Sequence, residues 1–350
     1  MSEEKIKAGI SLGDPNGISG ELIIKTFLDQ QMLRYCTPIL YGSSKAMSYL
    51  KRVLGYEDFN FSILKEGKPS LKQLNIVNCW DEGFNIELGQ ATTEAGGYAV
   101  KALEYATKDL KSGKIDCLVT LPINKKTVKQ SGFEFIGHTE FLKDYFEVKD
   151  NLMLMVSQNL RVAVCTGHIP LSKVSAAINE NNIKRKCRLL NQSLIQDFGI
   201  IKPKIAILGL NPHAGDNGAI GDDETRILIP AIKSLKEERI FCFGPFSPDG
   251  FFGSLQYQKY DGILAMYHDQ GLGPFKALAF DTGVNFTAGL PVIRTSPDHG
   301  PAYELAGKNI ASETSFRNSI FTAIDIYRNR ASYKEMTNSP LKRKTLNKES

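Results

Sequence analysis

Short apolar runs rich in β-branched residues alternate along the chain with longer segments in which apolar residues recur every three or four positions. The short runs end at glycine or at a polar turn and predict buried strands, whereas the spacing in the longer segments predicts amphipathic helices. The predicted strands span residues 6–12, 38–41, 115–120, 152–156, 162–165, 204–208, 262–266 and 284–287. The predicted helices span residues 21–30, 94–111, 183–198, 224–236 and 315–329. This alternation is typical of an α/β fold with a largely parallel sheet covered by helices.

The length of 350 residues predicts two domains or one large layered unit. No Gly-, Pro- or Ser-rich linker divides the chain, so the crossings between two domains would be short. After Arg330 the sequence becomes a polar mixture of Lys, Asn, Ser and Pro without apolar spacing. Residues 331–350 are therefore predicted to form a disordered tail.

The net charge of +5, from 43 basic and 38 acidic residues, is unevenly distributed along the chain. The last twenty residues hold five basic and two acidic side chains, so the tail contributes +3 and the rest is close to neutral. A nucleic-acid-binding body is therefore not expected. The basic tail is interpreted as a solvated end of the chain. The alternative, that the tail binds nucleic acid or a membrane, depends only on the cluster Lys342-Arg343-Lys344.

Composition and cysteine usage predict a soluble, cytoplasmic protein with no membrane partner. Hydrophobic residues make up 42% of the chain, enough for a sizeable core. The six cysteines are scattered and form no CxxC pair, which favours a reducing compartment. The first residues are charged and lack the features of a signal peptide, and no apolar run approaches the roughly 20 residues of a membrane helix.

The glycine pattern contains no nucleotide-binding fingerprint. There is no GxxxxGK[ST], and residues 271–276 lack the third glycine of a dinucleotide loop and lie far from the first predicted strand. The sequence therefore argues against a Rossmann cofactor site. Residues 13–20 and 209–221 are rich in glycine. These stretches fit either loops whose backbone N–H groups come close to a ligand or tight turns between a strand and a helix.

Three of the five histidines, His168, His213 and His268, each follow a strand-like run. Because the carboxyl ends of strands line the ligand crevice in open α/β sheets, these imidazoles are expected to converge. Three neutral imidazoles with an open coordination position would make a catalytic divalent-metal site. A structural role remains the alternative for any one of them.

Two aspartates are candidate catalytic residues beside these histidines. Asp269 directly follows His268, and Asp249 lies in a turn-rich segment. Either carboxylate fits the orientation of an imidazole or the transfer of a proton. Turn formation is the alternative for Asp249, because Pro-Asp-Gly is itself a turn signal.

A candidate anion site combines a helix start with two basic residues. His138 and Thr139 precede a segment of helical spacing, where free amides and the helix dipole favour a phosphate or carboxylate. Thr139 also fits a simple N-cap. Lys276, Asn285 and Arg294 share one region, and the planar guanidinium of Arg294 suits a bidentate anion, whereas Lys276 also fits an ordinary surface lysine.

Eight strings of these residues, in order along the chain, closely resemble the 4-hydroxythreonine-4-phosphate dehydrogenase family of pyridoxal phosphate biosynthesis. They are GDPNGI at 13–18, TLPINK at 120–125, GHTE at 137–140, TGHIPL at 166–171, LNPHAGDNG at 210–218, GPFSPD at 244–249, YHDQG at 267–271 and RTSPDHG at 294–300.

The resemblance implies a two-lobed α/β/α fold of the isocitrate and isopropylmalate dehydrogenase type, with the active site in the cleft between the lobes. The first lobe would comprise residues 1–130 and 295–330, and the second, residues 131–294, would carry the metal and dimer contacts. The implied protein is a homodimer with its active site at the subunit interface. It would use NAD or NADP, bound at residues not identified from the sequence, and one divalent ion (Zn, Mg or Co).

The resemblance also implies roles for individual residues. The metal ligands would be His168, His213 and His268, supplied by both subunits. The contacts with a small phosphorylated substrate would be His138, Thr139, Lys276, Asn285 and Arg294.

The implied reaction oxidises the secondary alcohol of 4-phosphohydroxy-L-threonine, followed by loss of CO2 to give 3-amino-2-oxopropyl phosphate. One alternative is a related dehydrogenase that acts on erythronate or threonate 4-phosphate. Another is a protein that binds metal or phosphate without catalysis.

Overall fold

One mixed sheet runs through the whole molecule, a computed structural model that describes residues 5–338 except 66, 81–82 and 84. Within these residues the strands follow the order β3-β4-β2-β1-β5-β12-β11-β6-β7-β10-β8-β9. The strands are β1 (Lys7–Ser11), β2 (Thr37–Gly42), β3 (Phe61–Ile63), β4 (Leu74–Asn78), β5 (Cys117–Thr120), β6 (Leu152–Ser157), β7 (Leu160–Val164), β8 (Lys204–Leu208), β9 (Phe241–Phe246), β10 (Gly262–Ala265), β11 (Val284–Ala288) and β12 (Arg294–Pro297).

The helices lie between the strands along the chain and cover the sheet. The α-helices are α1 (Ser19–Leu28), α2 (Met32–Tyr35), α3 (Ser44–Val53), α4 (Thr93–Lys111), α5 (Lys125–Gln130), α6 (His138–Tyr145), α7 (Val174–Ala177), α8 (Glu180–Gln196), α9 (Ile229–Glu237), α10 (Pro248–Gly253), α11 (His268–Ala279) and α12 (Thr314–Asn338). Short 3-10 segments η1 (Leu171–Lys173), η2 (Pro212–Gly218) and η4 (Gln256–Lys259) and a π-helical turn, η3 (Glu224–Leu228), complete the set.

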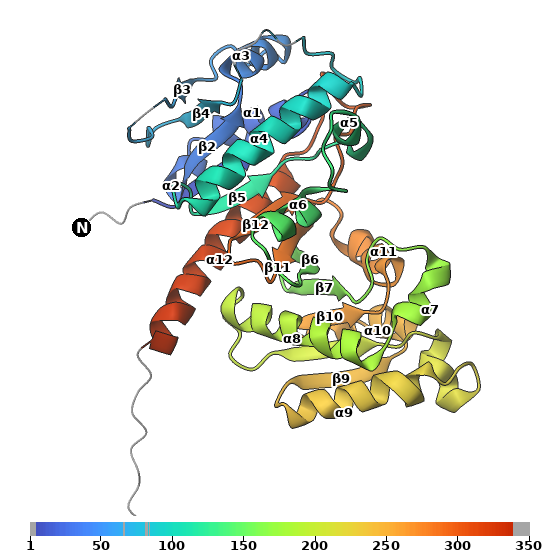
Figure 1. The fold of residues 1–350 in the computed structure, drawn as a ribbon. Helices are drawn as coiled ribbons and strands as arrows, with labels where there is room; N and C mark the ends of the chain where they lie inside the picture. Colours follow the sequence, from blue (N-terminus) through green and yellow to red (C-terminus); the bar gives the residue numbers. More distant parts are fainter. Residues whose placement is uncertain (1–4, 66, 81–82, 84, 339–350) are drawn as a thin grey trace, which may run out of the picture.

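The sheet is largely parallel, as predicted. Eight neighbouring strand pairs are parallel, and the three antiparallel pairs, β12–β11, β11–β6 and β6–β7, lie together in the middle. The expected α/β class is confirmed. The antiparallel centre separates a half built from β1–β5 and β12 from a half built from β6–β11 (Figure 1). The division into lobes at residues 130 and 294 stays a prediction.

Alternating side chains in β8 and β10 show that this half of the sheet is buried on both faces. Ile207 and Leu264 belong to the main core, which includes residues of α8 and α9, whereas Leu208 and Ala265 belong to a second core with residues of α10 and α11. A strand that is buried on both faces has a continuous run of apolar residues in its sequence. The sequence therefore predicted β8 and β10 to within one residue of their observed ends.

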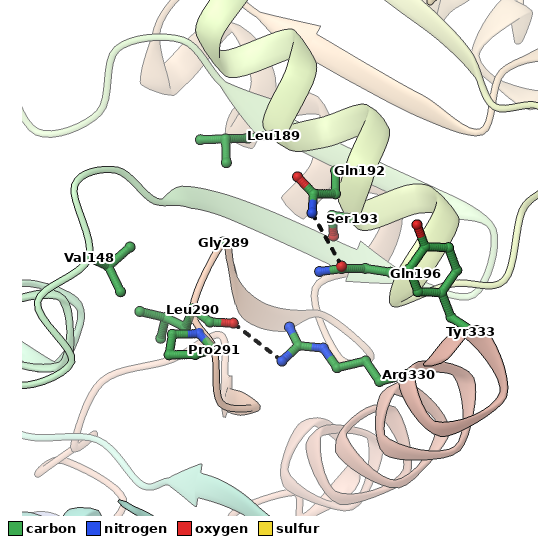
Figure 2. Close-up of a pocket in the computed structure, with 10 residues that line it drawn as sticks. All are labelled: Val148, Leu189, Gln192, Ser193, Gln196, Gly289, Leu290, Pro291, Arg330 and Tyr333. Atoms are coloured by element: carbon green, nitrogen blue, oxygen red, sulfur yellow. Dashed lines mark hydrogen bonds between the residues drawn. The ribbon is translucent and has the colours of Figure 1, made fainter. Parts of the chain in front are cut away.

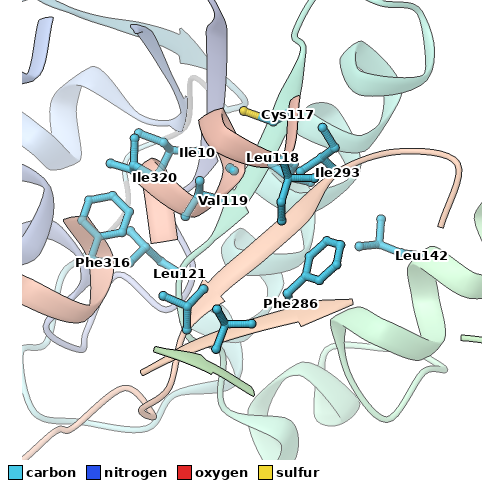
Figure 3. Packing of buried hydrophobic residues seen from close by; sticks show 14 of the residues in the cluster. Ile10, Cys117, Leu118, Val119, Leu121, Leu142, Phe286, Ile293, Phe316 and Ile320 are labelled. Atoms are coloured by element: carbon cyan, nitrogen blue, oxygen red, sulfur yellow. The ribbon is translucent and has the colours of Figure 1, made fainter. Parts of the chain in front are cut away.

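Four strands, β3, β4, β9 and β12, were not predicted. β12 is the informative case because Arg294, Thr295, Ser296 and Pro297 contain no aliphatic residue, yet all four are buried. The strand pairs with β5 and β11, and its polar side chains are buried beside the apolar side chains of its neighbours. Figure 3 shows Leu118 of β5, Phe286 of β11 and Leu142 of α6 packed around it. The long-range pairing of β12 is not visible in its own residues.

The predicted disordered tail is wrong for residues 331–338. Helix α12 continues to Asn338, eight residues past Arg330, and residues 339–350 of the predicted tail lie outside the described residues. The extension contains no Gly or Pro, and Arg330 holds this end of the helix by donating to Asp197 and to the carbonyl of Leu290. Figure 2 shows Arg330 and Tyr333 beside a cavity of about 490 Å³ between α8, α12 and the β11–β12 loop.

In the part of the chain that the structure describes, no helix is both long and apolar enough to cross a membrane.

Candidate functional site

A cavity of about 460 Å³ opens over the middle of the sheet and receives side chains from both halves. It is lined by all five predicted substrate residues and by two of the three predicted metal ligands. The predicted residues in its lining are His138, Thr139, His168, His268, Lys276, Asn285 and Arg294. Residues separated by up to 156 positions in the sequence therefore meet in one place.

Arg294 lies at the floor of the cavity and is only 3% exposed. Its Nε and Nη2 donate to the hydroxyl of Thr120 at 2.9 and 2.6 Å, and Nη1 donates to that of Thr287 at 3.3 Å. Burial lowers the pKa of Arg294 to about 10, and the nearby Glu140 partly opposes this shift. Among the described residues no carboxylate lies within ion-pairing distance of Arg294. Because a buried charge needs a counter-charge, the site favours an anionic ligand.

His138 and Thr139 begin helix α6 beside this cation. The N-cap is Gly137, whose lack of a side chain leaves the first amides of α6 without a capping acceptor. Thr139 is therefore not the N-cap, which was the alternative interpretation. Nε2 of His138 is buried without a hydrogen-bond partner. Burial, with Arg294 and Lys125 nearby, holds the pKa of His138 well below 6.5, so its ring is neutral at pH 7.

Helix α6 is held in this position by its apolar side. Phe141 and Leu142 are buried, and Phe141 contacts Phe133 and Phe135 with ring centroids 5.5 Å apart in each case. The sequence spacing that predicted a helix after residue 138 thus also determines which side of this helix is buried.

Lys276 and Asn285 complete the polar wall. Lys276 Nζ lies 3.2 Å from Oδ1 of Asp298, a side chain that is 13% exposed. Buried atoms without partners cluster here, namely Oδ1 of Asn285, Oδ2 of Asp298 and Nε2 of His299. Such atoms are costly unless a ligand or water satisfies them, so this wall is built for a polar ligand.

The imidazoles of His168 and His268 are neighbours in the cavity lining, with ring centroids 5.5 Å apart and ring planes inclined by 43°. His268 Nδ1 lies 2.6 Å from Oδ1 of Asp269. A carboxylate only accepts, so this pair favours the proton on Nδ1 and leaves Nε2 of His268 as a lone-pair donor. Burial, followed by Lys125 and His268, lowers the pKa of His168, which favours the neutral, metal-binding form of its ring.

His213 is not in this cavity. It lies on η2 with a left-handed backbone (φ 53°) and is exposed. The buried carboxylate of Glu224 holds this loop by accepting from the amides of Leu210 and Asn211 at 2.7 and 2.8 Å. No group of three or more His, Cys, Asp or Glu able to hold a metal occurs among the described residues. The expected convergence of three imidazoles therefore does not occur within one chain.

Asp249 also lies outside the cavity, at the start of α10. Its carboxylate is exposed and accepts from the hydroxyl of Ser247 at 2.5 Å. This hydrogen bond is the main cause that lowers the pKa of Asp249, and His213 contributes as a nearby charge. Three predicted residues are therefore missing from the cavity lining. Asp269 is exposed beside His268, whereas His213 and Asp249 are neighbours on another exposed surface.

Sequence reasoning assigned no role to several residues that line the cavity, namely Thr120, Lys125, Glu140, Asp298 and His299. All five belong to the strings TLPINK, GHTE and RTSPDHG, which supported the resemblance. Their membership of those strings was the available signal. Thr120, Asp298 and His299 are brought together only by the pairing of β5 with β12.

The family and sequence comparisons agree with this geometry. A model of the family described as pyridoxal phosphate biosynthetic protein PdxA matches residues 34–323. The 4-hydroxythreonine-4-phosphate dehydrogenase of Bacteroides thetaiotaomicron is 48% identical over 345 residues, which cover 98% of this chain and 94% of that protein. A putative D-threonate 4-phosphate dehydrogenase of Oceanobacillus iheyensis is 33% identical over 330 residues, covering 93% and 99%.

Solved structures give the same result. The 4-hydroxythreonine-4-phosphate dehydrogenase of Klebsiella pneumoniae has a TM-score of 0.79 at 32% identity, with 93% of this chain and 98% of that chain covered. Isocitrate dehydrogenase of Methylococcus capsulatus, at 11% identity, has a TM-score of 0.50 over 95% of this chain and 89% of that chain and supports the predicted fold type alone. The chain belongs to the PdxA family of pyridoxal phosphate biosynthetic proteins.

Proposed function

We propose that the protein catalyses the NAD(P)-dependent oxidative decarboxylation of 4-phosphohydroxy-L-threonine to 3-amino-2-oxopropyl phosphate. One observation carries this proposal: the buried guanidinium of Arg294 and the imidazole pair His168–His268 line the same cavity. An anion site beside a candidate metal site matches a phosphorylated hydroxy acid, and the 48% identical relative carries the name of this activity.

The anionic groups of the substrate are assigned to the basic and amide groups of the cavity. Arg294, the neutral ring of His138 and the free amides at the start of α6 would hold one anion, with Thr139 beside them. Lys276 and Asn285, which line the same cavity, would hold the rest of the acid. Fixing both anionic groups would hold the secondary alcohol close to His168 and His268.

Within one chain, the histidines of the cavity supply only part of the ligand set of a divalent ion. His168 and His268 offer two imidazole nitrogens, and Asp269 positions the second of them. When bound, the ion would supply Lewis-acid polarisation of a hydroxyl or carbonyl oxygen. Asp269 is the better-placed candidate for a proton-moving role, because it contacts an imidazole of the cavity. The choices among Zn, Mg and Co and between NAD and NADP remain part of the proposal.

A homodimer would complete the metal site. His213 and Asp249 are exposed neighbours outside the cavity of their own chain, which is where residues that serve a second copy should lie. The partner subunit's His213 would join His168 and His268 as the third ligand. This arrangement would put the active site at a subunit interface.

A cytoplasmic location is proposed with this activity. All six cysteines are free and buried, although Cys187 and Cys242 lie with their sulfur atoms 3.1 Å apart. Unpaired thiols this close together are typical of a reducing compartment.

The second candidate is a dehydrogenase of threonate or erythronate 4-phosphate, which have a hydroxyl where the first substrate has an amine. This second function is supported by the 33% identity with the Oceanobacillus iheyensis protein, which is named a putative D-threonate 4-phosphate dehydrogenase. The two functions share the phosphate, the carboxylate and the alcohol, so most of the cavity cannot distinguish them.

A substrate panel tests the proposal. Purified enzyme would be supplied with NAD or NADP and with each metal, and kcat/KM would be measured on 4-phosphohydroxy-L-threonine and on both hydroxy acids. The proposal expects the highest kcat/KM on the amino acid. A clear preference for a hydroxy acid would replace it with the second candidate, and metal binding without reduction of the nicotinamide would contradict both.

A further inference from the structure

The loop that carries His213 has a left-handed backbone. Five consecutive residues, 213–217, have φ angles of 53°, 52°, 81°, 41° and 54°. Only Gly215 among them is a glycine, and a side chain makes this conformation costly. Such a run persists only where the surrounding structure holds it. The hold must act on the backbone, because the side chain of His213 is exposed and makes no hydrogen bond within the described residues.

Glu224, in the π-helical turn η3, supplies this hold. Its Oε1 accepts from the amides of Leu210 and Asn211 at 2.7 and 2.8 Å, and its Oε2 accepts from Nδ2 of Asn211 at 3.0 Å. These hydrogen bonds fix the loop before His213. After His213, a Cβ placed on Gly215 would lie only 2.5 Å from Oε2 of Glu224. The carboxylate therefore contacts the loop on both sides of His213.

The charge of Glu224 is matched by these N–H groups and by no cation. The side chain is 3% exposed, and the nearby Arg226 pairs with Asp222 and Asp223 instead. Burying a carboxylate costs stability unless its oxygens are hydrogen-bonded. An uncharged amide would cost less to bury, but it has one acceptor oxygen, whereas the loop presents N–H groups to two. The loop that it holds therefore explains a buried carboxylate at this position.

Under the proposed function, on which this inference rests, His213 completes the metal site of the other subunit. A third ligand adds most to metal affinity when its ring is already in place before the ion binds. Within its own chain, no hydrogen bond orients the ring of His213, so the position of the ring depends on the backbone that Glu224 holds.

We propose that Glu224 is a positioning residue for the metal site of the other subunit, because it holds the left-handed loop that presents His213 across the interface. Its effect is exerted in trans. A substitution of Glu224 would impair the site whose other two ligands come from the partner chain. It would spare the site that contains His168 and His268 of its own chain.

The first experiment titrates Zn²⁺ into metal-free dimers of the wild type, Glu224→Gln and Asp222→Asn, and follows binding by calorimetry. Gln keeps the size of Glu but sets its NH₂ group against Nδ2 of Asn211. Glu224→Gln is expected to weaken Zn²⁺ binding by about 10- to 100-fold, the usual loss when a residue that orients a metal ligand is replaced. Asp222→Asn is the matched control, because this carboxylate is 61% exposed and pairs with Arg226. It should bind Zn²⁺ like the wild type.

Mixed dimers distinguish positioning in trans from a general loss of structure. Two affinity tags would isolate dimers in which Glu224→Gln is paired with His168→Ala or with His213→Ala. In the first pair both substitutions fall on the same site, so one site of wild-type Zn²⁺ affinity should remain. In the second pair each site carries one substitution, so none should remain. Melting temperatures of the metal-free dimers check folding.

Wild-type Zn²⁺ affinity in the Glu224→Gln dimer would overturn the proposal, as would equal numbers of tight sites in the two mixed dimers. Gly215→Ala, which places a methyl group against Oε2 of Glu224, is a second variant and should weaken binding in the same way.

The His213→Ala dimer separates this proposal from the proposed function. Unchanged Zn²⁺ affinity in His213→Ala would show that His213 is not a ligand, and the shared metal site would fail together with the role of Glu224. Weaker binding in His213→Ala beside unchanged binding in Glu224→Gln would contradict the positioning role alone.

Discussion

The guanidinium of Arg294 donates twice to the hydroxyl of Thr120, through Nε at 2.9 Å and Nη2 at 2.6 Å. A neutral hydroxyl orients the cation without neutralising it. The arrangement keeps a positive charge available at the floor of the cavity, and the protein bears the cost of burying it. This relationship between β5 and β12 is the basis of the first prediction.

Arg294→Met should separate binding from stability. The variant should lose most activity, with kcat/KM lower by at least about 100-fold, because the anion loses its main cation. Its unfolding free energy should be unchanged or higher by about 1 kcal/mol, because an unpaired buried charge is replaced by an apolar side chain. Urea unfolding would measure this, and a large loss of stability would contradict the assignment. Inorganic phosphate should raise the melting temperature of the wild type and not that of the variant.

Mixing two inactive variants should restore activity if the metal site is shared between subunits. His168→Ala and His213→Ala remove ligands that the proposal places on different chains of each site. Co-expressed, they would form heterodimers with one intact site, giving at most about one quarter of wild-type activity under random pairing. The matched control mixes His168→Ala with His268→Ala, whose substitutions fall on the same chain of each site, and should stay inactive. Equal activity in both mixtures would contradict the shared site.

His138 should make the folded state sensitive to acid. Burial holds its pKa well below 6.5, so below about that pH the unfolded chain takes up a proton that the native state does not. The unfolding free energy therefore falls as the pH drops below about 6.5, by on the order of 1 kcal/mol more in the wild type than in His138→Gln. Urea unfolding at about pH 5 and about pH 8 measures the difference. If the unfolding free energies of the two proteins changed with pH in parallel, His138 would bind a proton equally well in the native and the unfolded state.

Arg330 and Asp197 should be coupled in stability. Asp197 is fully buried, and its Oδ1 lies 2.6 Å from Arg330 Nε, while Oδ2 accepts from Ser193 at 2.7 Å. Because Arg330 is 18% exposed, Arg330→Met should cost about 2 kcal/mol, below the range for a fully buried pair. The double variant Asp197→Asn/Arg330→Met should cost less than the sum of the two single variants. Additive effects would mean that the pair does not interact.

Two truncations separate the contribution of Arg330 from that of the residues that follow it. Removing residues 331–350 keeps Arg330 and should leave kcat/KM intact, with a small loss of stability because Tyr333 no longer lies against the cavity of Figure 2. Removing residues 330–350 also removes Arg330 and should cost clearly more stability, because Asp197 then lacks its cation. Equal melting temperatures for the two truncated chains would contradict the role of Arg330.

Much of the architecture could be predicted because it depends on local patterns. The strands β8 and β10 lie in the apolar runs that predicted them, since both of their faces are buried. The helix α6 follows from the spacing of Phe141 and Leu142, and its first turn carries His138 and Thr139 toward the cavity. By contrast, β12 was not predicted because its burial depends on pairing with β5, which lies more than 150 residues away in sequence.

The sequence by itself determined the α/β class and identified the seven predicted residues that meet in the cavity, because strand ends and helix starts are local features. Only the tertiary structure decided which residues belong to one site. It joined His168 to His268, kept His213 and Asp249 apart on an exposed surface, and added Thr120 and Asp298 to the site. The physical reason is that convergence depends on strand order and register, which are set by pairing between distant segments and are not encoded in the spacing of any single segment.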